Sequence, residues 1–307
     1  MEATPSRTPP RSGPVQLGLV ASLLVVAAGA WAVTGDRMGG MDAGPGSELG
    51  GLGWFAVVWV TMMAAMMLPS IAPMVLAHAQ VQIGASPAFV AGYLLTWAAV
   101  GMLGYALVEG VRSLDLGVLA WDEAGPYVAG GAILAAAAYQ LSPLKNRSLR
   151  RCRNPRAFVS EHWRPGPVGA LRMGIEHGRV CVASSWALMA TLFALGVMSV
   201  GWMVLVAALI ATEKLLPWRT VATRGIAVLL AILGVALAFA PQDVPGLTVP
   251  GSSDAAPAMD AQAAAATGSP GIDAKRASPL GHLRRSLGTT LGGPQRGFRD
   301  FGRPLGS

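Results

Sequence analysis

One apolar stretch decides how this chain folds. It reads Trp59-Val60-Thr61-Met62-Met63-Ala64-Ala65-Met66-Met67-Leu68-Pro69-Ser70-Ile71-Ala72-Pro73-Met74. A transmembrane helix needs about 20 apolar residues, so the stretch is long enough to form most of a span. It differs from a plain lipid anchor because it concentrates thioethers and contains Pro69 and Pro73. It therefore predicts either a soft-metal site or a packing seam inside a helix bundle.

The composition places the whole chain among polytopic membrane proteins. Of its 307 residues, 53% are hydrophobic and only 13% are charged, which is unlike an ordinary soluble protein. The net charge of +7 comes largely from basic residues outside the apolar runs, so it indicates orientation in a membrane. We therefore expect the lipid bilayer as a partner, and no nucleic acid. The two cysteines are too few for a disulfide scaffold and are expected to be reduced.

The apolar runs predict an all-α polytopic transmembrane helix bundle of six to seven spans. They cover residues 15–33, 54–77, 88–108, 125–144 and 221–240. Residues 181–217 would form a helix of about 55 Å, against about 30 Å for a bilayer core, so they predict two short spans with a turn near 196–201. A cleaved signal peptide is the alternative for the first run, although its length and Trp31 favour an uncleaved helix.

Basic residues predict the orientation of the bundle. Residues 145–180 carry nine lysines and arginines against Glu161 and Glu176, which marks a cytoplasmic basic loop and an N-terminus on the same side. The chain then divides into a disordered basic N-terminus (1–14), the bundle (15–240) and a disordered C-terminal tail (241–307), since both ends are poor in large apolar residues. Glu213 and Lys214 lie at a span end and are interpreted as an interfacial pair.

The first group of candidate metal ligands lies on the span around residues 54–77. Met63, Met67, Met74 and His78 follow offsets that place them along one helix face. Thioethers are soft ligands that suit Cu(I). Pro69 and Pro73 remove backbone donors and predict a structural kink near mid-depth, where broken helices often bind transported ligands. The alternative is that methionine fills irregular packing gaps.

The second group lies at the basic loop and at the start of the following span. His177 and Cys181 are four residues apart, so they share a helix face and could contribute to a Cu(I) or Zn(II) site. Cys152 lies among arginines, which favour a thiolate. No catalytic partner accompanies these residues and no known nucleophile motif occurs, so we expect no enzyme activity.

Three blocks of sequence resemble a known family. They run from Trp59 to Met74, from Tyr139 through Cys152 to Pro155, and from His162 through Met173 to Met189. Over residues 54–217 the chain resembles an uncharacterised bacterial family of predicted metal-binding integral membrane proteins, a domain of unknown function with some members labelled copper chaperones. The resemblance implies a multi-pass protein of the bacterial cytoplasmic (inner) membrane. It also implies cysteines at three positions where this chain has Ser148, Ser184 and Ser185.

These observations combine into one working hypothesis. The protein binds or passes a soft metal ion, with Cu(I) the favoured ion, and exchanges it with a metal-delivering or metal-receiving protein. Met63, Met67 and Met74 are the expected ligands in the span, and His78, Cys152, His177 and Cys181 are the expected receivers on the cytoplasmic side. A structural or accessory membrane subunit, in which the methionines only pack, is one alternative, and a small-molecule transporter is another.

Overall fold

The computed structural model describes residues 13–40, 42, 44, 49–114, 124–216, 218–250, 252 and 255–266. Within these residues the chain is helical and contains no strand, which confirms the all-α prediction. The elements are α1 (Gly13–Met38), α2 (Leu52–Gln82), η1 (Ile83–Ala85), α3 (Ser86–Ser113), α4 (Gly125–Gln140), α5 (Pro143–Cys152), α6 (Pro155–His162), α7 (Gly166–Leu195), α8 (Val200–Leu215), α9 (Arg219–Phe239), η3 (Pro241–Asp243) and α10 (Ala256–Ala266).

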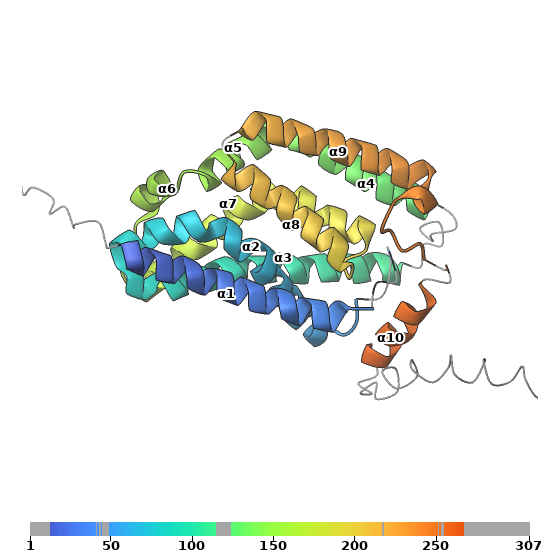
Figure 1. The fold of residues 1–307 in the computed structure, drawn as a ribbon, viewed down its shortest axis with the longest axis horizontal. Helices are drawn as coiled ribbons and strands as arrows, with labels where there is room; N and C mark the ends of the chain where they lie inside the picture. Colours follow the sequence, from blue (N-terminus) through green and yellow to red (C-terminus); the bar gives the residue numbers. More distant parts are fainter. Residues whose placement is uncertain are drawn as a thin grey trace, which may run out of the picture.

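The long helices lie side by side along one direction of the molecule (Figure 1). α1 and α2 pack together on one side, α4 and α9 on the opposite side, and α3, α7 and α8 lie between them. The short helices α5 and α6 lie at the end where α1 begins, and α10 lies at the other end. The molecule therefore has two distinct ends, and the basic segment occupies one of them.

α2 and α3 form an antiparallel hairpin that reverses at η1. The indole nitrogen of Trp59 donates a hydrogen bond of 2.8 Å to the carbonyl oxygen of Trp97. Farther from the turn, the rings of Phe55 and Tyr105 have centroids 5.0 Å apart. Along the first half of α2, earlier residues contact later residues of α3, so the two helices run in opposite directions.

α3 and α7 pack with their backbones in close contact. A Cβ atom added to Gly174 would lie 2.0 Å from the carbonyl oxygen of Phe89, and one added to Gly92 would lie 2.1 Å from the carbonyl oxygen of Leu171. Small residues at such crossings are typical of helices that associate in lipid, where close approach replaces the hydrophobic effect. α7 is held in this way at the centre of the bundle, and it carries two of the predicted ligands.

Gly174→Ala is expected to destabilise the fold, because the added methyl group meets backbone atoms that cannot rotate away. Overpacking of this kind lowers the free energy of unfolding by about 1–3 kcal/mol. The matched control is Gly131→Ala on α4, where an added Cβ has nothing within 4 Å. Unfolding in one detergent compares the two variants, and equal stability of both would contradict the close packing of α3 and α7.

Among the described residues, four helical stretches are long and apolar enough to cross a membrane. They are Gly13–Met38, Leu52–Ser113, Gly166–Leu195 and Thr220–Phe239, and a fifth is obtained if α4 and α5, bent by 67°, count as one. Leu52–Ser113 contains both α2 and α3. The helix α8 has 16 residues, fewer than the 18 that a candidate span needs. The prediction of six to seven spans, which separates α2 from α3 and counts α8, remains a prediction.

The basic segment 145–180 is largely helical. It contains most of α5, all of α6 and the first half of α7. At the other end of the chain, η3 and α10 lie within the segment 241–307 that was predicted to be disordered. Residues 1–12 and 267–307, which include most of the predicted disorder, lie outside the described residues. The predicted turn near 196–201 coincides with the junction between α7 and α8.

Candidate metal centre

Five helices contribute to the walls of a small, largely buried cavity near the basic end of the bundle. Its volume is about 260 Å³. Its walls include Ser70 and Met74 from α2, Cys152 from α5, His177 from α7 and Lys214 from α8. The cavity therefore brings together a thioether, a thiol and an imidazole that are separated by as many as 103 positions in sequence, counting from Met74 to His177.

The thiol of Cys181 lies beside this cavity and is fully buried. Lys214 Nζ donates a hydrogen bond of 2.9 Å to Cys181 Sγ, and the hydroxyl oxygen of Tyr93 lies 3.1 Å from the same sulfur. Lys214 Nζ also donates to Ser70 Oγ at 3.4 Å. The amino group of Lys214 is thus in direct contact with this sulfur.

Cys152 contacts both the other thiol and a serine of α7. A hydrogen bond with the Cys181 thiol, together with burial, raises the pKa of Cys152 well above its usual value. The expectation that neighbouring arginines favour the Cys152 thiolate is therefore wrong. Arg150 and Arg151 are exposed, and Arg153 donates hydrogen bonds to the backbone carbonyl oxygens of Glu213 and Leu216. None of these guanidinium groups is among the causes that shift the pKa of Cys152, although Arg153 lines the same cavity.

Ser184 of α7 is the second neighbour of Cys152. Ser184 Oγ lies 3.6 Å from Cys152 Sγ and 3.3 Å from Ser185 Oγ. Of the three serines that occupy cysteine positions of the resembled family, Ser184 thus lies beside a remaining thiol, and Ser185 lies beside Ser184. The serine side chains are buried, and Ser184 Oγ donates to the carbonyl oxygen of Cys181 at 2.8 Å.

His177 presents a ring nitrogen without a hydrogen-bond partner. Its side chain is only 2% exposed, and its Nδ1 atom has no partner in the described part of the chain. The ring packs against Phe89, Tyr93 and Phe158, with centroids 5.2 to 6.0 Å apart. Buried polar atoms are nearly always paired, so an unpaired imidazole nitrogen beside a cavity is a candidate ligand atom.

The predicted methionine ligands are buried and do not face lipid. Met63 and Met67 are fully buried and Met74 nearly so, but of the three only Met74 lines the cavity. α2 continues as one helix through Pro69 and Pro73, and Pro73 forms part of the cavity wall. A kink at the prolines, and a metal-binding role for Met63 and Met67, remain predictions.

His78 lies one helical turn beyond Met74, away from the cavity. Its Nδ1 atom is 3.4 Å from Ser86 Oγ, and its ring stacks on Phe89 with centroids 5.1 Å apart. The structure therefore gathers Met74, Cys152 and His177 at the cavity with Cys181 alongside, and it leaves His78 apart. Among the described residues, no three His, Cys, Asp or Glu side chains form a metal-binding group.

Lys214 is the residue of the site that sequence reasoning missed. Glu213 and Lys214 were interpreted as an interfacial pair, but both side chains are buried and each has its own partner. Glu213 Oε2 lies 2.7 Å from Lys145 Nζ, whereas Lys214 reaches Cys181. Successive residues of a helix point about 100° apart, which explains the separation. A lysine preceded by a long apolar helix was the available signal.

Long apolar helices around buried thiol, thioether and imidazole groups define a helical protein with a candidate soft-metal site. A family model described as PpoB2, copper chaperone, matches residues 56–237. The match covers more than half of the chain and includes every residue of the cavity, so the chain belongs to this family. This confirms the resemblance noted in the sequence. No curated protein and no solved structure matches the chain.

Proposed function

We propose that this protein is a multi-pass protein of the bacterial cytoplasmic membrane that binds Cu(I) and passes it to or from a partner protein, without catalysing a reaction. The observation that carries the proposal is the convergence of Met74, Cys152 and His177 on one buried cavity beside Cys181. The family description, copper chaperone, supports the choice of ion.

The thioether, imidazole and thiol groups suit Cu(I) because they are soft ligands, of which only a thiolate carries charge. Cysteine and methionine sulfur select Cu(I), and imidazole also binds copper. Ser70 is the single hydroxyl on the described cavity wall, and no carboxylate is present there to favour a hard cation. In this proposal Cu(I) displaces the ammonium group of Lys214 from Cys181 Sγ, so one cation replaces another.

Membrane insertion is supported by the surface and by the two ends of the bundle. Large apolar side chains are exposed along the long helices, including Leu17, Leu103, Ile232 and Phe239. A soluble monomer rarely exposes so much contiguous apolar surface. Counting α2 and α3 separately and adding α4 and α8 gives seven crossings. The start of α1 and the basic helices α5 and α6 then lie at the same, cytoplasmic end (Figure 1).

A Cu(I) titration of the purified full-length chain tests the proposal. We expect one Cu(I) to bind, and we expect the variant Met63→Leu/Met67→Leu/Met74→Leu to bind at least about tenfold more weakly, because it loses the thioether ligands. A competing chromophoric Cu(I) chelator measures both affinities. Leucine keeps the volume of methionine, so the core should remain packed.

The matched control replaces three buried methionines that lie outside the cavity: Met38→Leu/Met198→Leu/Met203→Leu. This variant should bind Cu(I) as the wild type does. Equal affinities for both triple variants would contradict the metal role of the span, and they would favour an accessory membrane subunit in which the methionines only pack.

A further inference from the structure

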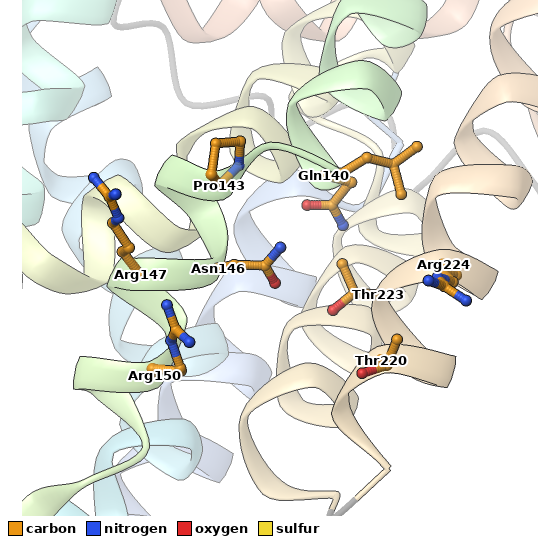
Figure 2. Close-up of a pocket in the computed structure, with 9 residues that line it drawn as sticks. Gln140, Pro143, Asn146, Arg147, Arg150, Thr220, Thr223 and Arg224 are labelled. Atoms are coloured by element: carbon orange, nitrogen blue, oxygen red, sulfur yellow. The ribbon is translucent and has the colours of Figure 1, made fainter.

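A cavity of about 710 Å³ lies between α5 and α9, outside the copper site proposed above. Figure 2 shows the polar side chains that line it, which come from α5, from α9 and from the end of α4. Those that matter for its chemistry are Gln140, Arg147, Arg150, Thr220, Thr223 and Arg224. None of them lines the cavity that contains Met74, Cys152 and His177, so the two sites are separate.

The cavity is positively charged and nothing in it neutralises the charge. Its ionisable lining residues are Arg147, Arg150 and Arg224, and no acidic residue is among the described residues that line it. None of the three arginines forms a salt bridge with another described residue. The neighbouring carboxylate of Glu213 is already paired. It lies 2.7 Å from Lys145 Nζ and accepts a hydrogen bond from Gln140. Three guanidinium groups around one cavity attract an anion.

Thr223 has a buried hydroxyl group with no partner. The residue is 4% exposed, and its Oγ1 atom makes no hydrogen bond to any described residue. Threonines in apolar helices usually donate to the carbonyl one turn back, as Thr61 does to Val57 at 2.8 Å and Thr191 does to Leu188 at 2.7 Å. Because Thr223 lines the cavity without such a bond, its hydroxyl is available to a bound acceptor oxygen.

Apolar surface continues from the cavity along α9. Val228 and Ile232 follow Arg224 at helical spacings of four and eight, so they lie on the same face, and both are exposed. Leu141, on the wall of the cavity, is exposed as well. A cationic pocket that opens onto an apolar helix face matches a molecule with a phosphate group and a hydrocarbon chain.

We propose that this cavity binds a phosphate group, with Arg147, Arg150 and Arg224 contacting its oxygens and Thr223 donating a hydrogen bond to it. Arginine pairs well with phosphate because its planar donors match two oxygens at once. The phosphate can belong to the headgroup of an anionic phospholipid or to free inorganic phosphate. This site does not depend on copper binding, since it shares no lining residue with the cavity of the proposed copper site.

The test compares two double variants of equal charge in the full-length protein. Arg147→Gln/Arg224→Gln removes two arginines of the cavity, and the control Arg156→Gln/Arg172→Gln removes two exposed arginines outside it. Thermal unfolding is followed in three conditions: phosphatidylcholine nanodiscs, nanodiscs containing phosphatidylglycerol, and phosphatidylcholine nanodiscs with inorganic phosphate. Native mass spectrometry counts retained phosphatidylglycerol.

We expect the wild type and the control to be stabilised by phosphatidylglycerol or by inorganic phosphate relative to phosphatidylcholine alone, and the cavity variant to bind that ligand at least about tenfold more weakly. Stabilisation by phosphatidylglycerol alone identifies an anionic phospholipid, and stabilisation by inorganic phosphate identifies the free anion. Thr223→Val keeps the shape of the side chain and should weaken the same response. Equal responses of both double variants, or no response of the wild type to either ligand, would overturn the proposal.

Discussion

The double variant Cys152→Ser/Cys181→Ser will bind Cu(I) at least about 100-fold more weakly than the wild type. Serine preserves the size of each side chain but replaces a soft sulfur ligand with a hydroxyl that binds Cu(I) poorly. Cys152 and Lys214 line the same cavity, and Lys214 donates a hydrogen bond to Cys181, so both sulfurs lie at one site. Competition against a chromophoric Cu(I) chelator, in detergent, gives the two affinities.

A rescue variant separates loss of ligands from loss of structure. Cys152→Ser alone should weaken Cu(I) binding, and Cys152→Ser/Ser184→Cys should restore most of it. Ser184 Oγ lies 3.6 Å from Cys152 Sγ, so the exchange moves one sulfur a short distance, from α5 to α7. A general structural defect would not be repaired by the second change. Unaltered Cu(I) affinity in the double serine variant would rule out the thiols as ligands.

The long helices could be predicted from sequence because each contains a long apolar run, and some of these runs end at a residue that favours a turn. The turn between α7 and α8 illustrates this: Gly196 has a positive φ of 107°, a conformation that side chains disfavour, and the predicted turn begins there. The helices α5 and α6 were not predicted, because their many charged residues were interpreted as a basic loop. Their starts carry recognisable signals, since Ser142 and Asn154 cap helices whose first residues are Pro143 and Pro155.

The candidate site could be predicted only in part, because helix periodicity gives the face of a residue but not its neighbours. The spacing of His177 and Cys181 predicts that they share a helix face, and both side chains are buried. The same reasoning joined His78 to Met74, although His78 contacts Ser86 and Phe89 instead. The contact of Lys214 with the site could not be predicted, because a lysine at the end of a span usually reaches the interface. Its bond to Cys181 depends on how α7 and α8 meet.

A buried ion pair at the same end of the bundle leads to the last prediction. Lys145 Nζ lies 2.7 Å from Glu213 Oε2, and both side chains are almost completely buried. Gln140 joins the pair, because its Nε2 atom donates to Glu213 Oε1 at 3.0 Å and its Oε1 atom accepts from Lys145 Nζ. The network ties α4, α5 and α8 together between the two candidate sites.

Lys145→Met will lower the free energy of unfolding by about 3–5 kcal/mol, because it leaves the carboxylate of Glu213 buried without its counter-ion. Lys145→Met/Glu213→Gln should recover most of that loss, since both charges are removed and the introduced amide can still bond to Gln140. Arg164→Met is the matched control: it breaks the Arg164–Glu176 pair at 3.1 Å, whose side chains are 46% and 29% exposed. Loss of such an exposed pair costs about 0–1 kcal/mol. Denaturant unfolding of the three variants in one detergent measures the differences, and a double variant as unstable as Lys145→Met would show that the stranded charge is not the cause.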